Sequence, residues 1–297
     1  MSEETFNSND QTPGVPRREF VSMSIAGGLA AAAVSAAAMP LSETNVEITT
    51  PDGTCDAAFI HPTSGSHAAV IIWTDAFGLR PSMREIGKRI AAEGYAVLVP
   101  NPYYRIGKAP MWEDASGFSF SNQQDRAKLN PLMASIGADG AAEKDAAAFV
   151  EFLDKQKAVN KKRKIGTQGY CMGGPLVMRT CAAVPDRLGA GASFHGGGLV
   201  TDRPNSPHLL APKIKAQMYF GIAANDDPKV EGDNKWKALR EALAAAHVKA
   251  EYEVFASQHG WCVSDMPKQA NGEPIYNKPD AEHAWGKLVV LYKSALA

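Results

Sequence analysis

Short apolar runs that alternate with helical segments constrain the fold of this 297-residue chain more than any other feature. Residues 68–73 and 95–100 are continuous apolar runs, which are typical of strands buried on both faces of a sheet. This alternation predicts an α/β fold with a mostly parallel central sheet and helices on both of its faces. Further strands are expected over 46–50, 57–60, 164–168, 190–194, 216–222 and 250–255, and helices over 82–93, 141–156, 172–183, 235–246 and 281–295.

The composition excludes several classes of protein. Lys and Arg (31) nearly balance Asp and Glu (32), so the chain has no excess of positive charge with which to bind nucleic acid. Hydrophobic residues make up 45% of the chain and charged residues 21%, as in globular proteins and unlike collagen or disordered chains. The four cysteines form no C-x-x-C pair and the histidines show no H-x-x-x-H spacing. The sequence therefore predicts neither a metal site nor a cofactor.

The first 38 residues differ from the rest of the chain. Arg17, Arg18 and Phe20 precede an uncharged run rich in Ala and Gly, which ends in small residues at 36–38. A positive pair, a weakly apolar run and a small-residue end indicate a cleaved bacterial export signal, and the paired arginines resemble a twin-arginine signal. The run is too weakly apolar to be a stable membrane anchor, and an Ala-rich helix of the fold is the alternative interpretation. We expect residues 39–297 to form one domain that the twin-arginine machinery delivers to the periplasm or the medium.

Residues 101–138 are polar and contain scattered aromatic side chains, so we expect a long irregular loop there. Loops of this length inside a compact domain usually have a function. Trp112, Phe118 and Phe120 could form a lid over an apolar pocket, and ordinary surface packing is the alternative.

One motif carries nucleophile chemistry. Cys171 lies at the centre of Gly169-Tyr170-Cys171-Met172-Gly173, between a predicted strand and a predicted helix. This G-x-C-x-G pattern is that of the nucleophile elbow of α/β hydrolases, with Cys in place of Ser. The glycines allow two backbones to approach at a strained turn. The helix N-terminus favours a thiolate and offers the Met172 N–H to an oxyanion. A buried structural cysteine is the alternative.

An elbow of this kind requires an acid and then a histidine further along the chain. Asp226 follows the predicted strand 216–222, and His259 follows the predicted strand 250–255. Both lie just past the carboxyl ends of strands, where α/β sheets bind their ligands. We expect His259 to take the thiol proton and return it to the leaving group, while Asp226 holds the imidazole tautomer. Asp227 competes with Asp226 for this role.

Further segments make the chain resemble the dienelactone hydrolase family, which are cysteine enzymes of the α/β-hydrolase fold. The resemblance runs from about Asn45 to Leu296. It implies that a 39–297 catalytic domain hydrolyses a lactone or carboxylic ester through a thioester acyl-enzyme, with oxyanion donors at the N–H groups of Met172 and Ala76. The segments that carry it are DAFGLRP at 75–81, GY at 94–95, PYYR at 102–105, GYCMGG at 169–174, HGW at 259–261 and AW at 284–285.

The chain departs from the family pattern at two places. The best-known members carry a Glu that accepts the thiol proton, and Asp75 stands there with one methylene less. A direct contact with Cys171 then requires a shifted loop or a water, so Asp75 is expected either to activate the thiol or to support the site indirectly. Family arginines hold the dienelactone carboxylate; Arg126 lies in a suitable region, but Val263 stands where a second arginine is expected. An uncharged ester or lactone therefore fits the sequence as well as a dienelactone does.

The sequence also offers candidates for substrate contact. The candidates are Tyr103, Arg105, Arg126, His195 and Trp261. Arg105 has a surface arginine as its alternative, and His195 a turn packed against the elbow. A thioesterase or peptidase with the same three residues and a ligand-binding protein without turnover are the competing functions. We expect a monomer that acts on a small molecule.

Overall fold

A computed structural model describes residues 39–226, 235–269 and 271–297. The chain divides into two units, Met1–Ala37 and Ala38–Ala297, and all described residues belong to the second unit. The predicted export signal lies outside the described residues.

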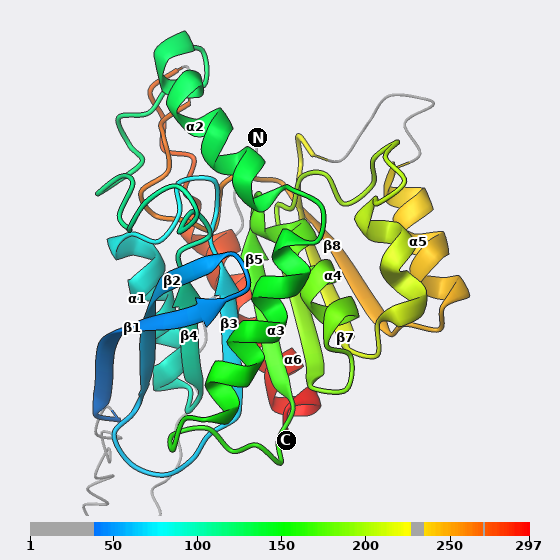
Figure 1. The fold of residues 1–297 in the computed structure, drawn as a ribbon. Helices are drawn as coiled ribbons and strands as arrows, with labels where there is room; N and C mark the ends of the chain where they lie inside the picture. Colours follow the sequence, from blue (N-terminus) through cyan, green and yellow to red (C-terminus); the bar gives the residue numbers. More distant parts are fainter. Residues whose placement is uncertain (1–38, 227–234, 270) are drawn as a thin grey trace, which may run out of the picture. The chain divides into compact units, whose positions relative to one another are not determined.

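An eight-stranded sheet forms the centre of the domain (Figure 1). β1 pairs antiparallel with β2 and β2 with β4, whereas every neighbouring pair from β4 to β8 is parallel. The apolar runs of the sequence become β3 and β4, whose residues are all buried. The mostly parallel sheet predicted from the sequence is confirmed. In spatial order the strands are β1 (Leu41–Thr50), β2 (Gly53–Pro62), β4 (Ala96–Pro100), β3 (Ala69–Trp73), β5 (Ile165–Tyr170), β6 (Leu188–Phe194), β7 (Gln217–Ala223) and β8 (Ala250–Phe255).

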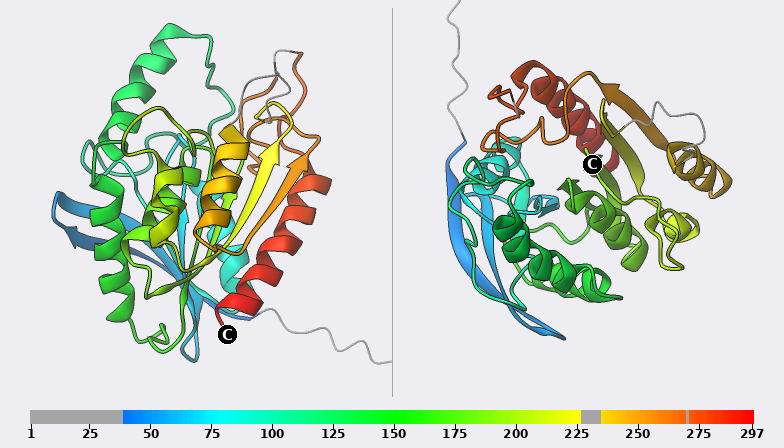
Figure 2. Two further views of the ribbon diagram at one scale, coloured as in Figure 1. Left: turned by 90° about the vertical axis from the view of Figure 1, so that its right-hand side faces the viewer. Right: turned by 90° about the horizontal axis from the view of Figure 1, so that it is seen from above.

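Helices cover both faces of this sheet (Figure 2). On one face lie α3 (Ala141–Asp154), α4 (Gly173–Ala183) and α5 (Lys235–Ala245), with the short 3-10 helix η1 (Pro207–Lys213) between α4 and α5. On the other face lie α1 (Pro81–Ala92) and α6 (Lys278–Ala295). Each predicted helix is present within a few residues of its expected ends. The chain therefore has the three-layer architecture that the alternation predicted.

The expectation of an irregular loop over 101–138 is wrong for its second half. Helix α2 (Gln123–Ile136) occupies that part and lies above the carboxyl ends of the parallel strands (Figure 1). The Asn122 side chain accepts hydrogen bonds from two backbone N–H groups of the first turn and so begins the helix. Pro131 lies inside the helix on its exposed side and hides its pattern in the sequence, because proline removes a backbone donor. Leu129, Leu132 and Ile136 form its buried stripe.

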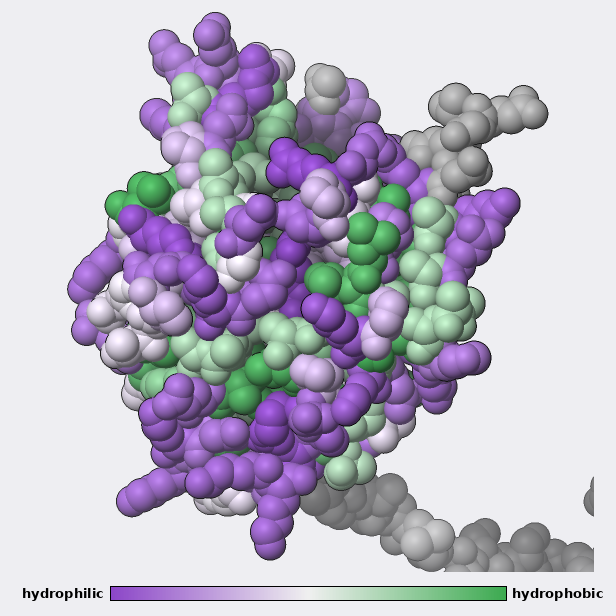
Figure 3. All heavy atoms as spheres, turned by 45° about the vertical axis from the view of Figure 1, so that its right-hand side comes forward, coloured by the Kyte–Doolittle hydropathy of each residue, from purple (hydrophilic) through white to green (hydrophobic). Residues whose placement is uncertain are grey.

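On the face seen in Figure 3, apolar side chains gather in a few small groups among hydrophilic ones. Among residues 39–226, 235–269 and 271–297, no helix is both long enough and apolar enough to span a membrane.

Candidate active site

Cys171 lies on a strained turn between β5 and α4. Its backbone has φ of 51°, in the left-handed region that residues with a side chain rarely adopt. A Cβ on Gly169 would lie 2.3 Å from the Gly173 carbonyl oxygen, and one on Gly173 would lie 2.6 Å from the carbonyl oxygen of Trp73. Both glycines of the motif are therefore required by backbone contact, as the elbow pattern predicted. The turn leaves the Cys171 side chain partly exposed at the carboxyl end of the sheet.

Asp226 and His259 meet beside this turn. Asp226 follows β7 and His259 follows β8, and the Asp226 Oδ2 lies 2.7 Å from the His259 Nδ1. The backbone N–H of His259 donates to the Asn225 side chain at 2.7 Å, which ties the two loops together. The competing acid, Asp227, lies outside the described residues.

The charge state of His259 follows from its two partners. Burial lowers the pKa of His259, but hydrogen bonds with Asp226 and Cys171, and the charges of these two groups, raise that pKa to about 10. The imidazole therefore remains protonated at neutral pH. It lies between a carboxylate on one side and the Cys171 sulfur on the other, so a proton can pass between the sulfur and the imidazole.

Two backbone N–H groups near Cys171 are available to a ligand. No hydrogen bond among the described residues uses the N–H of Ala76 or of Met172 as its donor. Ala76 follows β3 and Met172 follows β5, which are neighbouring parallel strands. The Tyr103 hydroxyl joins the two loops, because it donates to the Ala76 carbonyl at 2.6 Å and lies 3.4 Å from the Met172 Sδ. These two N–H groups can donate hydrogen bonds to an oxyanion.

Asp75 is held by a neighbouring arginine. Its two carboxylate oxygens accept from the Arg80 guanidinium at 2.7 and 2.9 Å, and Oδ1 also accepts from the Phe77 N–H. The Asp75 side chain is buried, and its described contacts do not include the Cys171 sulfur.

His195 lies directly behind the nucleophile. Its Nδ1 accepts from the Cys171 backbone N–H at 3.1 Å, and its ring centroid lies 4.8 Å from that of His259. Burial, and next the charge of His259, lower the pKa of His195 well below its ordinary value. His195 is therefore neutral with its proton on Nε2, which is buried without a hydrogen-bond partner in the described structure. The fully buried His195 side chain thus holds the backbone of the elbow through its hydrogen bond with Cys171.

The other predicted substrate contacts have partners within the protein. Arg105 forms ion pairs with Asp52 and the buried Asp145. Arg126, on α2, donates to the Phe120 carbonyl at 2.6 Å. Tyr103 and Trp261 are completely buried. The described hydrogen bonds and ion pairs of these four side chains do not include the Cys171 sulfur. Tyr103 nevertheless lies within range of Cys171, because burial and the charge of Asp75, and next the charge of Cys171, raise the pKa of the Tyr103 hydroxyl.

The aromatic residues of the 101–122 segment pack on the loop that carries Ala76. The Phe77 ring centroid lies 5.8 Å from that of Trp112, 5.0 Å from that of Phe118 and 6.1 Å from that of Phe120. These side chains therefore cover the loop between β3 and α1 and contribute apolar packing to it.

The remaining cysteines are Cys55, Cys181 and Cys262. All four cysteines are free thiols. Burial raises the pKa of Cys181 to about 12 and raises the pKa values of Cys55 and Cys262 as well. These three thiols are protonated at neutral pH and are poor nucleophiles.

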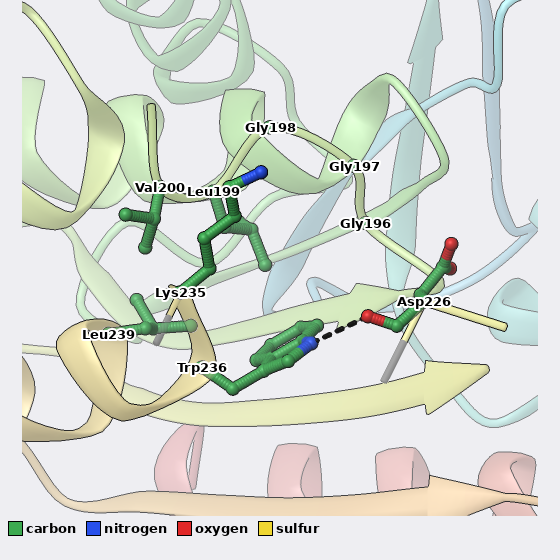
Figure 4. A pocket seen from close by; sticks show the side chains of 9 residues that line it. All are labelled: Gly196, Gly197, Gly198, Leu199, Val200, Asp226, Lys235, Trp236 and Leu239. Atoms are coloured by element: carbon green, nitrogen blue, oxygen red, sulfur yellow. Dashed lines mark hydrogen bonds between the residues drawn. The ribbon is translucent and has the colours of Figure 1, made fainter. Parts of the chain in front are cut away.

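Two cavities adjoin the site. The Asp226 cavity, of about 200 Å³, extends from the glycine loop 196–198 to the start of α5 (Figure 4). There the Trp236 indole N–H donates to the Asp226 carbonyl at 2.8 Å. The Met172 cavity, of about 330 Å³, lies between α2, α4 and the segment before η1. Both cavities share Gly197 and Gly198 in their walls, so one stretch of backbone without side chains borders both.

Sequence reasoning missed one charged contact at this site. Arg80 lies in the DAFGLRP segment. Besides Asp75, it donates to Asp265, which lies 185 residues further along the chain in a loop without a motif. Within the part of the chain that the structure describes, no group of His, Cys, Asp and Glu could hold a metal ion.

The comparisons with known proteins identify the family of the chain. The model of the dienelactone hydrolase family matches residues 55–296. An Escherichia coli K12 protein named "Putative carboxymethylenebutenolidase" is 25% identical over 279 residues, covering 86% of this chain and 93% of its own. The Rhodococcus opacus carboxymethylenebutenolidase is 24% identical over 46% of this chain and 48% of its own.

A solved structure shows the same fold. The dienelactone hydrolase-like promiscuous phosphotriesterase from metagenomic libraries superposes with a TM-score of 0.69 at 21% identity, over 86% of this chain and 99% of its own. With the family model matching most of the chain, the chain belongs to the dienelactone hydrolase family and is a hydrolase of the α/β-hydrolase fold, of the kind that cleaves lactones or carboxylic esters.

Proposed function

We propose that this protein hydrolyses a lactone or carboxylic ester with Cys171 as nucleophile, His259 as general acid and base, and Asp226 as the residue that orients His259. The observation that carries the proposal is the 2.7 Å contact between Asp226 Oδ2 and His259 Nδ1. The same imidazole also forms a hydrogen bond with the Cys171 side chain. A nucleophile, a base and an orienting acid in hydrogen-bond contact constitute the machinery of acyl transfer.

Acylation begins when the Cys171 sulfur, having given its proton to His259, attacks the carbonyl carbon of the substrate. The carbonyl oxygen becomes an oxyanion, which the N–H groups of Met172 and Ala76 stabilise. His259 then donates its proton to the alkoxide as the C–O bond breaks. The product of this step is a thioester on Cys171, and for a lactone the released hydroxyl remains attached to the acyl chain.

Deacylation uses the same groups in reverse. His259 takes a proton from a water molecule, whose oxygen attacks the thioester carbonyl. The C–S bond breaks, the carboxylic acid leaves, and the proton returns to the Cys171–His259 pair. The two donors hold the second oxyanion as they held the first.

Two cavities near the site could hold parts of the substrate. Met172 borders one of these cavities and Asp226 borders the other. We propose that the two cavities hold the parts of the substrate on the two sides of its reacting carbonyl. Val263 is buried and offers no charge after His259. We therefore propose that the substrate can be a neutral ester or lactone as well as one that carries a carboxylate.

Trapping the acyl-enzyme tests this proposal. The purified protein is mixed with p-nitrophenyl acetate, quenched in acid within milliseconds, and digested for mass spectrometry. We expect an acetyl group on the Cys171 peptide and turnover of neutral lactones and esters at higher kcat/KM than of acyl thioesters or peptide anilides. Absence of both acylation and turnover with every substrate would refute the hydrolase proposal.

We further propose that residues 1–38 are a twin-arginine signal, recognised by the twin-arginine export machinery, and that the enzyme works in the periplasm or outside the cell. The support is the Arg17-Arg18 pair followed by a weakly apolar, small-residue run. A domain that is exported by this route crosses the membrane already folded.

A reporter fused after residue 45 and active only outside the cytoplasm tests export. We expect signal from the wild-type leader and loss of that signal when Arg17 and Arg18 are both changed to Lys, because the route reads the paired arginines. Signal that persists in the double-lysine variant would contradict the twin-arginine route.

A further inference from the structure

Arg80 forms a buried ionic contact with two carboxylates. Its Nη1 and Nη2 donate to the two oxygens of Asp75 at 2.7 and 2.9 Å. Its Nε and Nη2 donate to the two oxygens of Asp265 at 2.8 and 2.7 Å. The Arg80 side chain is 0% exposed, Asp75 1% and Asp265 17%, so this cluster is shielded from water.

Both partners belong to loops that carry reacting groups. Asp75 immediately precedes Ala76, and its Oδ1 and carbonyl oxygen also accept from the backbone N–H groups of Phe77 and Gly78. The Ala76 peptide is therefore enclosed in a turn that the Asp75 carboxylate closes. Asp265 lies six residues after His259, in the loop between β8 and α6. Arg80 thus connects the loop of an oxyanion donor with the loop of the general base.

The local sequence places Arg80 for this contact. Pro81 is the first residue of α1, and the residue before a proline is biased toward an extended backbone. Arg80 is indeed extended, with φ of −150°. Its guanidinium carbon lies 5.4 Å from the centre of the Phe77 ring, whose other neighbours are the aromatic side chains of the 101–122 segment.

Fold stability alone does not explain such a contact. Burying three charged groups carries a large desolvation penalty, and well-packed apolar residues in their place are often as stabilising. What two bidentate contacts supply is geometric restraint, because the planar guanidinium fixes both carboxylates in direction as well as in distance.

We propose that Arg80, acting through Asp75 and Asp265, is a positioning residue that holds the Ala76 N–H in register with Cys171 and His259. The proposal rests on the proposed cysteine mechanism. It assigns Asp75 to the oxyanion loop rather than to the thiol, because both carboxylate oxygens are already bonded to Arg80.

Kinetics of Arg80→Lys and Asp265→Asn test the proposal. Lysine keeps the positive charge of Arg80 but cannot make two bidentate contacts, and asparagine keeps the shape of Asp265 without its charge. Thermal melting verifies that both variants fold. Since misplacing an oxyanion donor costs about 10²-fold, we expect kcat for p-nitrophenyl acetate to fall by about 10²-fold in Arg80→Lys and by about 10-fold in Asp265→Asn, with KM little changed. The rate at which iodoacetamide alkylates Cys171 should stay at the wild-type value, because the thiol is untouched.

Arg84→Lys is the matched control. Arg84 lies one turn further along α1 and pairs with Glu43 at the surface, with 27% of its side chain exposed. We expect its kcat to equal that of the wild type.

The remaining outcomes separate this proposal from the one on which it rests. Unchanged kcat in both Arg80→Lys and Asp265→Asn, or a rise in KM alone, would overturn the positioning role while leaving the hydrolase intact. Slower alkylation of Cys171 in Arg80→Lys would also overturn it, since Asp75 would then act on the thiol. Wild-type protein without Cys171-dependent turnover would instead refute the hydrolase itself.

Discussion

Replacing Cys171 with alanine is expected to lower kcat/KM for esters and lactones by roughly 10⁴-fold or more. Without the sulfur no thioester can form, and only the oxyanion donors and substrate binding remain to accelerate attack by water. Initial rates with p-nitrophenyl acetate, measured at enzyme concentrations high enough to detect the residual activity, check this prediction.

Cys262→Ala is the control for this substitution. Cys262 borders a separate cavity of about 50 Å³ beneath α6, and burial raises the pKa of its thiol well above the ordinary value. Its loss should leave both turnover and acylation unchanged. Activity close to the wild-type value in Cys171→Ala, or loss of activity in Cys262→Ala, would show that a different group attacks the substrate.

Replacing Asp226 with asparagine is expected to lower kcat/KM by about 10⁴-fold, because the amide no longer holds the imidazole in its working tautomer. The substitution also changes how stability depends on pH. The Asp226 hydrogen bond is one cause of the raised pKa of His259, about 10 against an ordinary value near 6.5. A raised pKa in the folded state contributes stability that is fully present below about pH 6.5 and is lost as the pH rises through about 10.

Melting temperatures of wild type and Asp226→Asn across pH 6 to 10.5 measure that contribution. We expect the wild type to exceed the variant most at pH 6 and the gap to narrow as the pH approaches 10 and beyond. A gap that stays constant, or widens with pH, would mean that the Asp226–His259 contact does not set the protonation of His259. Asn225→Ala serves as a comparison, because Asn225 contacts the His259 backbone and not its ring.

Those parts of the site that follow directly after a strand could be predicted from the sequence. The carboxyl ends of parallel strands meet at one edge, so Cys171 after β5, Asp226 after β7 and His259 after β8 were expected to come together. The choice between Asp226 and Asp227 could not be made in this way, because adjacent residues in a turn point in directions that the pattern does not specify.

Contacts between loops that are far apart in the chain could not be predicted from the sequence. Asp265 lies 185 residues from Arg80, and nothing in the composition of its loop indicates a partner. Arg105, a candidate for substrate contact in a family motif, has ion-pair partners that the sequence did not indicate, namely Asp52 and the buried Asp145. A motif specifies residue types, whereas the pairing of charges depends on the three-dimensional packing of segments far apart in the chain.

The glycine loop between the two cavities has a consequence for how this scaffold can change. A Cβ at Gly197 would meet no atom within 4 Å, although Gly197 borders both cavities. A side chain added there would occupy cavity space without disturbing the backbone around the nucleophile. With the cavities as the proposed substrate sites, a substitution at Gly197 is expected to change the range of substrates while the reaction chemistry stays the same. The position is therefore a starting point for laboratory evolution of the enzyme.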